Sequence, residues 1–336
     1  MSQGAFRGVF TIPSTPFDRN GDIEWGDLKR VIDFCVDCGA HGIVWPVNAS
    51  GFPVLTDEER LQGMRVIVEQ TAGQIPVILG VHWGVSGHHA AMFSRRAQEL
   101  KADGMIAMAP YVQELEDEGA LVQYFQAIDR EVDVPIFIQN HARGSVLSIN
   151  TMVRLLNEVE HVEYIKEETF PVTHMIMGLI EQAGPKLKGV FGGAGGRYLL
   201  FEHPRGVVGQ MPGCHVTDVI VRLWDALEAG DLKEAKRVYG MMAPLFALET
   251  LKGTSYPEVL RRRQVIKSSR SRLTTSYPTQ DAYDHEALDD ILKDLASLFT
   301  WREEPILYGT PEWIIGAKEV STASNDSSVD TFDRAG

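Results

Sequence analysis

The sequence contains no apolar run of the roughly 20 residues that a membrane-spanning helix requires. Its first residues, "MSQGAFRGVF", also lack the charged start and apolar core of a secretory signal peptide. We therefore expect a cytoplasmic protein that has no membrane partner. The sequon at Asn48 is then a chance match, because glycosylation requires secretion.

Cysteine is scarce, with only Cys35, Cys38 and Cys214 in 336 residues. A structural zinc site needs four ligands, and the pair in "FCVDCG" has no second pair to complete one. Three histidines, His88, His89 and His141, have no accompanying carboxylate pattern. We expect reduced cysteines that pack in the core, and no metal.

Positive charge is also in short supply: Lys and Arg number 32 against 46 Asp and Glu, which gives a formal net charge of -14. This balance opposes nonspecific attraction to nucleic acid and favours a small-molecule partner. One basic run, residues 261–272, lacks interleaved aromatics and is predicted to be a solvated or intersubunit helix face.

Short apolar runs alternate with longer segments of helical periodicity along most of the chain, which predicts parallel β/α units. The runs cover residues 8–13, 42–47, 75–81, 104–110, 134–140, 162–167, 187–193 and 205–213. Eight such units close naturally into an α/β fold, the (β/α)8 TIM barrel, with its active site at the carboxyl ends of the strands.

The chain is divided by its patterns into three parts. Residues 1–228 are predicted to form the barrel, and residues 229–302 a C-terminal helical extension packed on it. Residues 303–336 are polar and rich in small residues, and are predicted to form a tail that is flexible toward its end. Within the barrel, Thr56 and Glu59 have the spacing of a helix capping box.

The stretch "VEYIKEETFP" places Lys166 at the carboxyl end of the predicted strand 162–167. Burial there disfavours the ammonium, and a neutral amine can attack a carbonyl carbon to form a Schiff base. Side chains alternate along a strand, so Lys166 and Glu168 share one face and Glu167 lies on the other. The two residues are a candidate nucleophile and acid/base, although the same spacing also suits a simple ion pair.

Several segments together resemble one known family. They are "IPSTPFDRNGDI", "LTDEER", "PYV", "VPIFIQN" and "YIKEET", and they cover about residues 5 to 300. The resemblance is to the dihydrodipicolinate synthase and N-acetylneuraminate lyase superfamily. It implies that Lys166 forms the Schiff base with a 2-oxo acid, without a cofactor, in a homotetramer or homodimer.

The sequence departs from that superfamily at the residues that contact substrate. Where a loop usually holds the substrate carboxylate, this chain has "VNASGF", in which Asn48, the Ala49 backbone and Ser50 can donate hydrogen bonds. Gln139 replaces a proton-relay tyrosine, and Val112 follows Tyr111 where a second relay tyrosine is expected. An amide cannot relay a proton at neutral pH, which argues against a dihydrodipicolinate synthase.

The pattern at the ends of the fifth and sixth strands looks most like the 2-keto-3-deoxy sugar acid dehydratases, such as the 2-keto-3-deoxyarabonate dehydratases. It consists of Gln139, Asn140, Lys166, Glu168 and Thr169. Catalytic roles are therefore predicted for Lys166, Glu168 and Gln139. The predicted substrate-binding residues are Asn48, Ala49, Ser50, His82, Tyr111, Asn140, Gly192 and Gly193. The last two belong to the run "FGGAGG", which suits either a phosphate or a close approach of the backbone to the carbon chain of the substrate.

The sequence thus predicts a Schiff-base lyase that acts on a small 2-oxo acid, with dehydration preferred. Two alternatives remain open at this stage. One is a pyruvate-releasing aldolase or hydratase-aldolase of the same superfamily. The other is a noncatalytic 2-oxo acid binding protein on a degenerate barrel.

Overall fold

The computed structural model describes residues 6–112, 115, 117–252, 255–272, 280–301 and 304–308. Most of the predicted tail, 303–336, lies outside the described residues. Within them, no helix is long and apolar enough to cross a membrane. No group of three or more His, Cys, Asp or Glu side chains within the same ranges is arranged to hold a metal ion.

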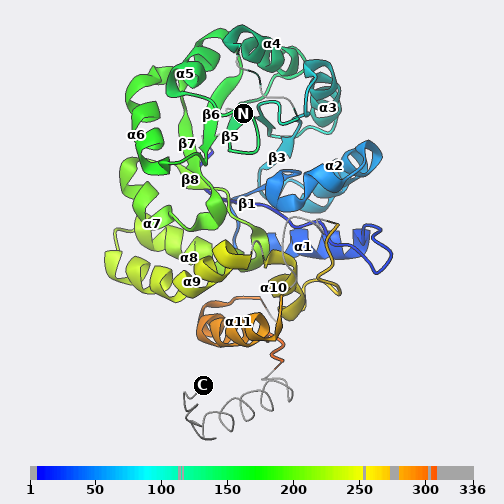
Figure 1. The fold of residues 1–336 in the computed structure, drawn as a ribbon, viewed down its shortest axis with the longest axis vertical. Helices are drawn as coiled ribbons and strands as arrows, with labels where there is room; N and C mark the ends of the chain where they lie inside the picture. The colour runs from blue at the N-terminus through cyan, green and yellow to red at the C-terminus, as the bar shows by residue number, and fades with distance from the viewer. Residues whose placement is uncertain are drawn as a thin grey trace, which may run out of the picture.

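Eight parallel strands form a closed barrel in the order β1 to β8, which confirms the predicted fold class (Figure 1). Their bounds are β1 Gly8–Thr11, β2 Gly42–Trp45, β3 Val77–Gly80, β4 Gly104–Met108, β5 Ile136–Asn140, β6 Val162–Glu167, β7 Gly189–Gly192 and β8 Gly209–Gln210. Each lies within a predicted apolar run. Most are shorter than the run, because the apolar residues at its ends belong to loops that pack on the barrel.

Helices surround the strands as an outer ring (Figure 1). They are α1 Trp25–Asp37, α2 Asp57–Thr71, α3 Gly87–Glu99, α4 Glu118–Asp129, α5 Ile149–Glu158, α6 Val172–Gln182, α7 Leu199–Glu202 and α8 Thr217–Glu228. The predicted capping box at the start of α2 is present. The Glu59 amide donates to Thr56 Oγ1 at 3.2 Å, and the Thr56 amide donates to Glu59 Oε2 at 2.9 Å.

Short 3-10 turns make several of the connections. They are η1 Asn48–Ser50, η2 Phe52–Val54, η3 Gly184–Lys186, η4 Ala194–Gly196, η5 His203–Arg205, η6 Cys214–Val216 and η7 Ala296–Leu298. Of these, η1 follows β2 and η4 follows β7, so both lie at the carboxyl ends of strands.

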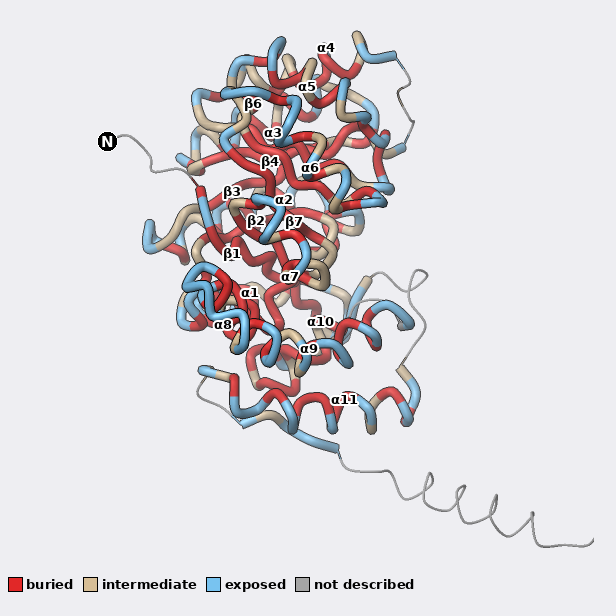
Figure 2. The backbone as a smooth tube through the Cα atoms, turned by 90° about the vertical axis from the view of Figure 1, so that its left-hand side faces the viewer, coloured by how far each residue is buried: buried red, intermediate tan, exposed pale blue. Residues whose placement is uncertain are grey.

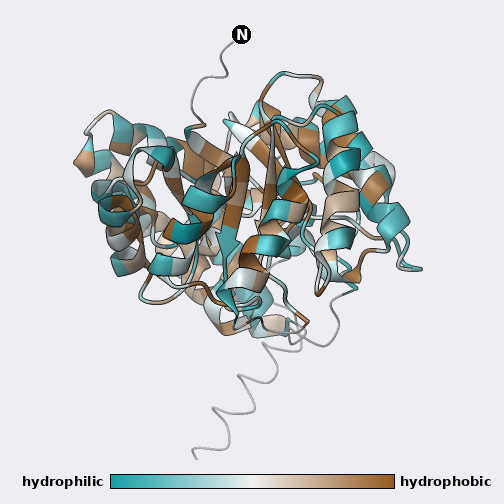
Figure 3. Cartoon of the chain, turned by 90° about the horizontal axis from the view of Figure 1, so that it is seen from above, coloured by the Kyte–Doolittle hydropathy of each residue, from teal (hydrophilic) through white to brown (hydrophobic). Residues whose placement is uncertain are grey.

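Apolar side chains fill both sides of the barrel wall. The strands are buried along their length (Figure 2), and they are mostly hydrophobic inside a ring of helices that carries the polar residues (Figure 3). The lumen itself is packed with aromatic rings from Phe6, Phe10, Phe137, Tyr164 and Phe191. The Phe137 and Tyr164 rings stack with centroids 4.5 Å apart. This packing closes the lumen beneath the carboxyl-end mouth.

Three helices follow the barrel: α9 Leu232–Lys252, α10 Tyr256–Arg262 and α11 Ala282–Leu295. In Figure 1 they lie below the barrel, with α11 farthest from it. Cys35, Cys38 and Cys214 are free and buried, as expected of packing cysteines.

The prediction of a solvated or intersubunit face for residues 261–272 is wrong for Arg262 and Arg263. The Arg263 guanidinium is buried and lies 2.6 Å from Asp218 on α8, and Arg262 is buried against Asp289 on α11. A carboxylate partner offsets the cost of burying each guanidinium charge. These arginines therefore tie the appended helices together and to the barrel.

Candidate active site

A cavity of about 230 Å³ opens at the carboxyl ends of the strands. Four residues singled out from the sequence line it: Asn48, Ala49, Lys166 and Glu168. The remaining lining residues are Ile12, His141, Arg143, Ala194, Gly195, Arg197, Met211, Gly213 and Tyr256. The cavity therefore collects residues that follow β1, β2, β5, β6, β7 and β8. It also includes Lys166, near the end of β6, and Tyr256, the first residue of α10.

Lys166 and Glu168 face each other inside this cavity, as strand alternation predicts. The Lys166 Nζ lies 3.1 Å from Glu168 Oε2, and both side chains are buried. The same carboxylate oxygen accepts a hydrogen bond from Gln139 Nε2 at 2.7 Å. Its other oxygen, Oε1, accepts one from the Ala194 amide at 2.9 Å. The three residues predicted to be catalytic are thus in mutual contact.

The charge state of Glu168 depends on these neighbours. Burial by itself raises the pKa of the Glu168 carboxyl, but the positive charge of Lys166 outweighs it, with help from His141, the Ala194 amide and Gln139. The net effect lowers the pKa of Glu168 to about 2. Glu168 is therefore a carboxylate, able to accept a proton, as long as a positive charge stands on Lys166.

The two predicted glycines of the "FGGAGG" run have different surroundings. A Cβ at Gly193 would lie 2.3 Å from Glu168 Oε1, so the absence of a side chain leaves room for the carboxylate. A Cβ at Gly192 would instead meet Gln210 Oε1 and Glu202 Oε2, each at 2.1 Å. Gly193 thus leaves room for Glu168, whereas Gly192 faces Gln210 and Glu202 and does not line the cavity.

The loop after β2 only partly meets expectation. Asn48 and Ala49 line the cavity. The Asn48 carboxamide oxygen is buried and has no hydrogen-bond partner among the described residues. Ser50 does not line the cavity: its hydroxyl accepts from the Val47 amide at 3.3 Å, and it closes the η1 turn. The predicted contact between Ser50 and substrate is therefore replaced by a role in holding this loop.

Asn140 was predicted to orient substrate, but its side chain lies on the opposite face of β5. It donates to Glu167 Oε2 at 2.9 Å and accepts from the Leu147 amide at 2.9 Å. Glu167 in turn accepts from the Thr169 amide at 2.6 Å. Strand alternation explains the correction, because Asn140 and Glu167 each follow a lumen-facing residue by one position.

His82 and Tyr111 also lie outside the cavity wall. His82 is fully buried with its ring 4.1 Å from that of Phe52, and the Tyr111 ring lies 5.3 Å from the same phenylalanine. Burial, together with Arg60, lowers the pKa of His82 well below its usual range, so the ring is neutral. Both residues pack behind the loop after β2, away from the cavity to which the sequence prediction assigned them.

Four lining residues with polar side chains were not predicted from the sequence to be site residues: His141, Arg143, Arg197 and Tyr256. The first two directly follow β5, and this position is a signal that could have identified them. Tyr256 gave none, because it comes from α10 in the appended helices. Its ring stacks on His215 at 4.1 Å, and His215 Nε2 lies 2.8 Å from Glu249 Oε1.

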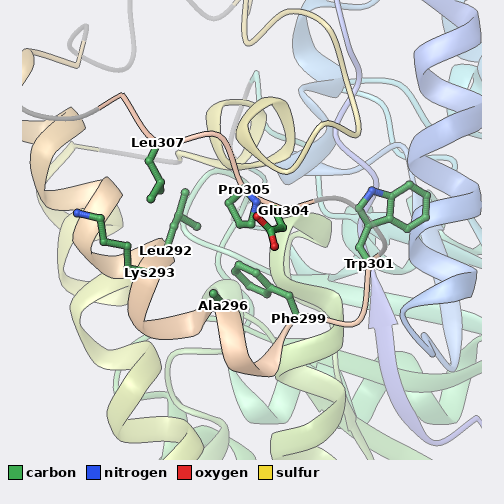
Figure 4. A pocket seen from close by; sticks show the side chains of 8 residues that line it. All are labelled: Leu292, Lys293, Ala296, Phe299, Trp301, Glu304, Pro305 and Leu307. Carbon is green, nitrogen blue, oxygen red and sulfur yellow. The ribbon is translucent and has the colours of Figure 1, made fainter.

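A larger hollow of about 470 Å³ lies between α11 and the segment that follows it (Figure 4). Its wall is largely apolar, with Leu292, Phe299, Pro305 and Leu307 among its residues. Its single ammonium, that of Lys293, pairs with Asp290 at 3.0 Å. This hollow contains no counterpart of the Lys166 and Glu168 pair, so chemistry is placed at the barrel mouth.

A closed eight-stranded α/β barrel with a lysine and a carboxylate in its mouth defines a class of barrel lyases and synthases. Comparison with protein families makes the assignment specific: the chain belongs to the dihydrodipicolinate synthetase family, whose model matches residues 5–288. This agrees with the resemblance seen in its motifs.

Individual relatives include enzymes of two kinds. An L-2-keto-3-deoxyarabonate dehydratase of Azospirillum brasilense is 30% identical over 272 residues, which cover 79% of this chain and 87% of that enzyme. A 4-hydroxy-tetrahydrodipicolinate synthase of Aquifex aeolicus is 30% identical over 245 residues, 72% of this chain and 81% of the enzyme.

Solved structures support the same fold. The dihydrodipicolinate synthase from Aquifex aeolicus superposes with a TM-score of 0.79 at 24% identity, covering 88% of this chain and 100% of that one. The corresponding enzyme from Thermotoga maritima gives a TM-score of 0.78 at 21% identity, covering 88% and 100%.

Proposed function

We propose that Lys166 forms a Schiff base with a small 2-oxo acid and that the enzyme eliminates water from a 2-keto-3-deoxy sugar acid. The proposal depends on the buried contact between Lys166 and Glu168. Gln139 is the third member of this group, because it donates a hydrogen bond to Glu168. The reaction needs no cofactor, because the imine is the electron sink. A homo-oligomer remains our expectation for the assembly.

The first step is addition of the neutral Lys166 amine to the C2 carbonyl of the substrate. The C2 oxygen leaves as water, which takes one hydrogen from the amine nitrogen and the proton that the Lys166 ammonium released on becoming neutral, and a protonated imine links C2 to the lysine nitrogen. The loop after β2, with the Asn48 side chain and the Ala49 backbone, is suited to hold the adjacent C1 carboxylate. This step generates the positive charge that the next one uses.

Elimination follows from the electron demand of the iminium, which acidifies the hydrogens on C3. Glu168 removes one of them, and the C3–H electrons flow to the nitrogen to give a neutral enamine. The enamine then expels the C4 hydroxyl, which takes a proton from Glu168 and departs as water. Hydrolysis of the resulting unsaturated imine releases the 2-oxo acid product and restores Lys166.

The proton affinity of Glu168 changes as the charge on the lysine nitrogen changes during the reaction. While the lysine nitrogen is positive, the carboxylate is stabilised, as its low pKa indicates. Formation of the neutral enamine removes that charge and leaves burial as the dominant influence, which favours the protonated carboxyl. Glu168 is therefore suited to hold the C3 proton for as long as the enamine lasts.

Gln139 favours elimination over carbon–carbon cleavage. Retro-aldol cleavage requires a base that removes the proton from the C4 hydroxyl, and an amide cannot serve as one. Gln139 instead donates to Glu168 and orients it. The similarity to an L-2-keto-3-deoxyarabonate dehydratase also favours elimination, whereas the synthase relatives share the barrel without deciding the reaction.

The test is incubation with a panel of 2-keto-3-deoxy sugar acids, with products identified by mass spectrometry and NMR. Loss of one water with the carbon chain intact is the expected result. Stoichiometric release of pyruvate would establish the aldolase alternative, and inertness toward every member, without imine formation, would indicate a binding protein.

A further inference from the structure

The wall of the mouth cavity carries more positive than negative charge. Lys166, Arg143 and Arg197 line it, and among the described lining residues Glu168 is the only carboxylate. Burial lowers the pKa of the fourth basic residue, His141, so its ring tends to be neutral. The cavity is thus cationic in a chain whose formal net charge is -14.

The two arginines occupy one side of the barrel mouth. Arg143 follows β5 and Arg197 follows β7, and these strands are the two neighbours of β6, which carries Lys166. Asn48 and Ala49 follow β2, which lies across the closed barrel from β6. A substrate joined to Lys166 through C2, with its C1 carboxylate toward β2, would extend its remaining carbons toward the arginine side.

The side chain of Arg197 has an unsatisfied hydrogen-bond donor next to the cavity. Its Nε atom is buried and has no hydrogen-bond partner, and no acidic side chain within the described parts of the chain forms an ion pair with it. The peptide oxygen of Arg197 accepts from Tyr239 at 2.8 Å, which fixes its backbone. A guanidinium with an unsatisfied donor, on an anchored backbone at the cavity wall, is suited to an anionic ligand.

The acidic groups around the cavity do not neutralise this site. Glu168 is paired with Lys166 at 3.1 Å, and Glu249 lies 2.8 Å from His215. Glu202 is buried, and burial next to Glu168 raises its pKa to about 8, so it holds a proton at neutral pH. The positive charge of Arg197 therefore remains available to a ligand.

The loop that carries Arg197 is also open to close approach. Gly195 lies in the left-handed region with φ of 70°, and a Cβ there would meet the Tyr256 hydroxyl at 2.8 Å. The Tyr256 hydroxyl, the Gly195 backbone and the Arg197 guanidinium thus belong to one section of the cavity wall. A ligand oxygen in this section would lie close to the loop backbone and within the same wall as the Arg197 guanidinium.

We infer that Arg197 forms a distal anion site, and that the substrate is a 2-oxo acid with a second acidic group at the far end of its carbon chain. The inference rests on the proposed function, since it takes Lys166 as the point of attachment. A terminal carboxylate and a terminal phosphate share the chemistry that a guanidinium recognises. Either would make the substrate a dianion.

The test measures imine formation rather than turnover, by borohydride trapping on the full chain at increasing concentrations of two six-carbon 2-oxo acids. 2-Oxoadipate carries the terminal carboxylate, and 2-oxohexanoate carries a methyl group in its place. We expect half-maximal trapping of 2-oxoadipate at a concentration about tenfold lower or better, the effect of one charge-assisted contact. Arg197→Gln should abolish this preference and leave 2-oxohexanoate trapping unchanged.

Two further variants make the result interpretable. Arg197→Lys keeps the charge and should retain part of the preference, which a merely disrupted loop would not. Arg205→Gln removes an exposed arginine of η5 that hydrogen-bonds only to the Phe201 carbonyl in the described structure, and should behave as the wild type. Equal trapping of both acids by the wild type, or a preference that survives Arg197→Gln, would overturn the distal site while the Schiff base stands.

A last comparison shows whether the second acidic group of the substrate is a phosphate or a carboxylate. Trapping with 2-keto-3-deoxy-6-phosphogluconate is compared with its unphosphorylated counterpart and with 2-oxoadipate. Tighter trapping of the phosphorylated acid that depends on Arg197 identifies a phosphate site, and the reverse order identifies a carboxylate site. Failure to trap any 2-oxo acid, including pyruvate, would overturn the proposed Schiff base together with the distal site.

Discussion

Glu168 is held on both of its oxygens while it faces Lys166: Oε2 lies 3.1 Å from the Lys166 ammonium, and Oε1 accepts from the Ala194 backbone. The carboxylate is therefore fixed by the loop after β7 and by Gln139, independently of the lysine. This arrangement allows the roles of nucleophile and proton carrier to be separated by mutation.

Lys166→Ala should abolish covalent trapping. Borohydride reduces a protonated imine to a stable secondary amine, so pyruvate with the wild-type chain should give an adduct whose mass and peptide position identify Lys166. The variant should give none. Lys188→Ala, at the entrance to β7, is the matched control and should trap as the wild type does; trapping that persists without Lys166 would refute the assignment.

Glu168→Gln should separate imine formation from turnover. The amide keeps the size of the side chain but cannot accept the C3 proton, so turnover should fall about 10²-fold or more, as is typical of a lost general base. Trapping on Lys166 should persist. Normal turnover by this variant would assign the proton transfer to another group.

Gly193→Ala should impair catalysis through Glu168 alone. The new methyl group would stand 2.3 Å from Glu168 Oε1, and the carboxylate must move to admit it. We expect turnover to fall by about tenfold or more while trapping continues. Gly240→Ala on α9, where nothing lies within 4 Å of the added Cβ, is the matched control and should be fully active.

Chelators should leave the activity unchanged. The protonated imine supplies the electron sink that a metal ion would otherwise provide. The rate of product formation before and after prolonged treatment with EDTA, followed by gel filtration, checks this. Loss of activity that zinc or magnesium restores would favour a metal-dependent mechanism.

The buried carboxyl group of Glu202 should make the free energy of unfolding depend on pH. Two acceptors, Glu202 Oε2 and Gln210 Oε1, each lie 2.1 Å from the position a Gly192 Cβ would take, and neither has a donor among the described residues. The Gln210 amide nitrogen is committed to the Gly193 carbonyl at 2.6 Å. A proton on Glu202 satisfies both acceptors, which agrees with a pKa that burial raises to about 8.

The folded chain therefore holds a proton that the unfolded chain releases between its usual pKa of 4.5 and about 8. The free energy of unfolding should fall as pH rises through this window, by at most roughly 1.4 kcal/mol per pH unit from this group. Denaturant titrations from pH 5 to 9 should show a flatter profile in Glu202→Gln. Glu181→Gln, exposed on α6, is the control; an unchanged slope in Glu202→Gln would disprove the buried proton.

The fold was accessible to sequence reasoning because a parallel barrel strand is buried on both faces and leaves a continuous apolar run. The pairing of Lys166 with Glu168 was accessible for a related reason, since the alternation of side chains is local. The same rule applied to β5 separates Gln139 from Asn140, and it corrects the role given to Asn140.

Contacts between distant segments were beyond the reach of that reasoning. From the sequence, Arg262 and Arg263 look like part of a charged surface. The sequence does not show that Arg262 pairs with Asp289 of α11 and Arg263 with Asp218 of α8. From the position of His82 at the end of a strand we predicted a substrate contact, because the sequence does not show that Phe52 packs against its ring. Tyr256 was missed for the same reason, as no local pattern places α10 beside the barrel mouth.

The presence of Tyr256 in the cavity wall affects the order in which the cavity forms during synthesis of the chain. Once the ribosome has released β8, every strand of the barrel is available for pairing. The cavity still lacks the part of its wall that α10 contributes. It becomes complete only when α10 has emerged and folded back over His215. A nascent chain thus passes through a stage at which Lys166 already stands on its strand while the part of the cavity wall that contains Tyr256 is still missing.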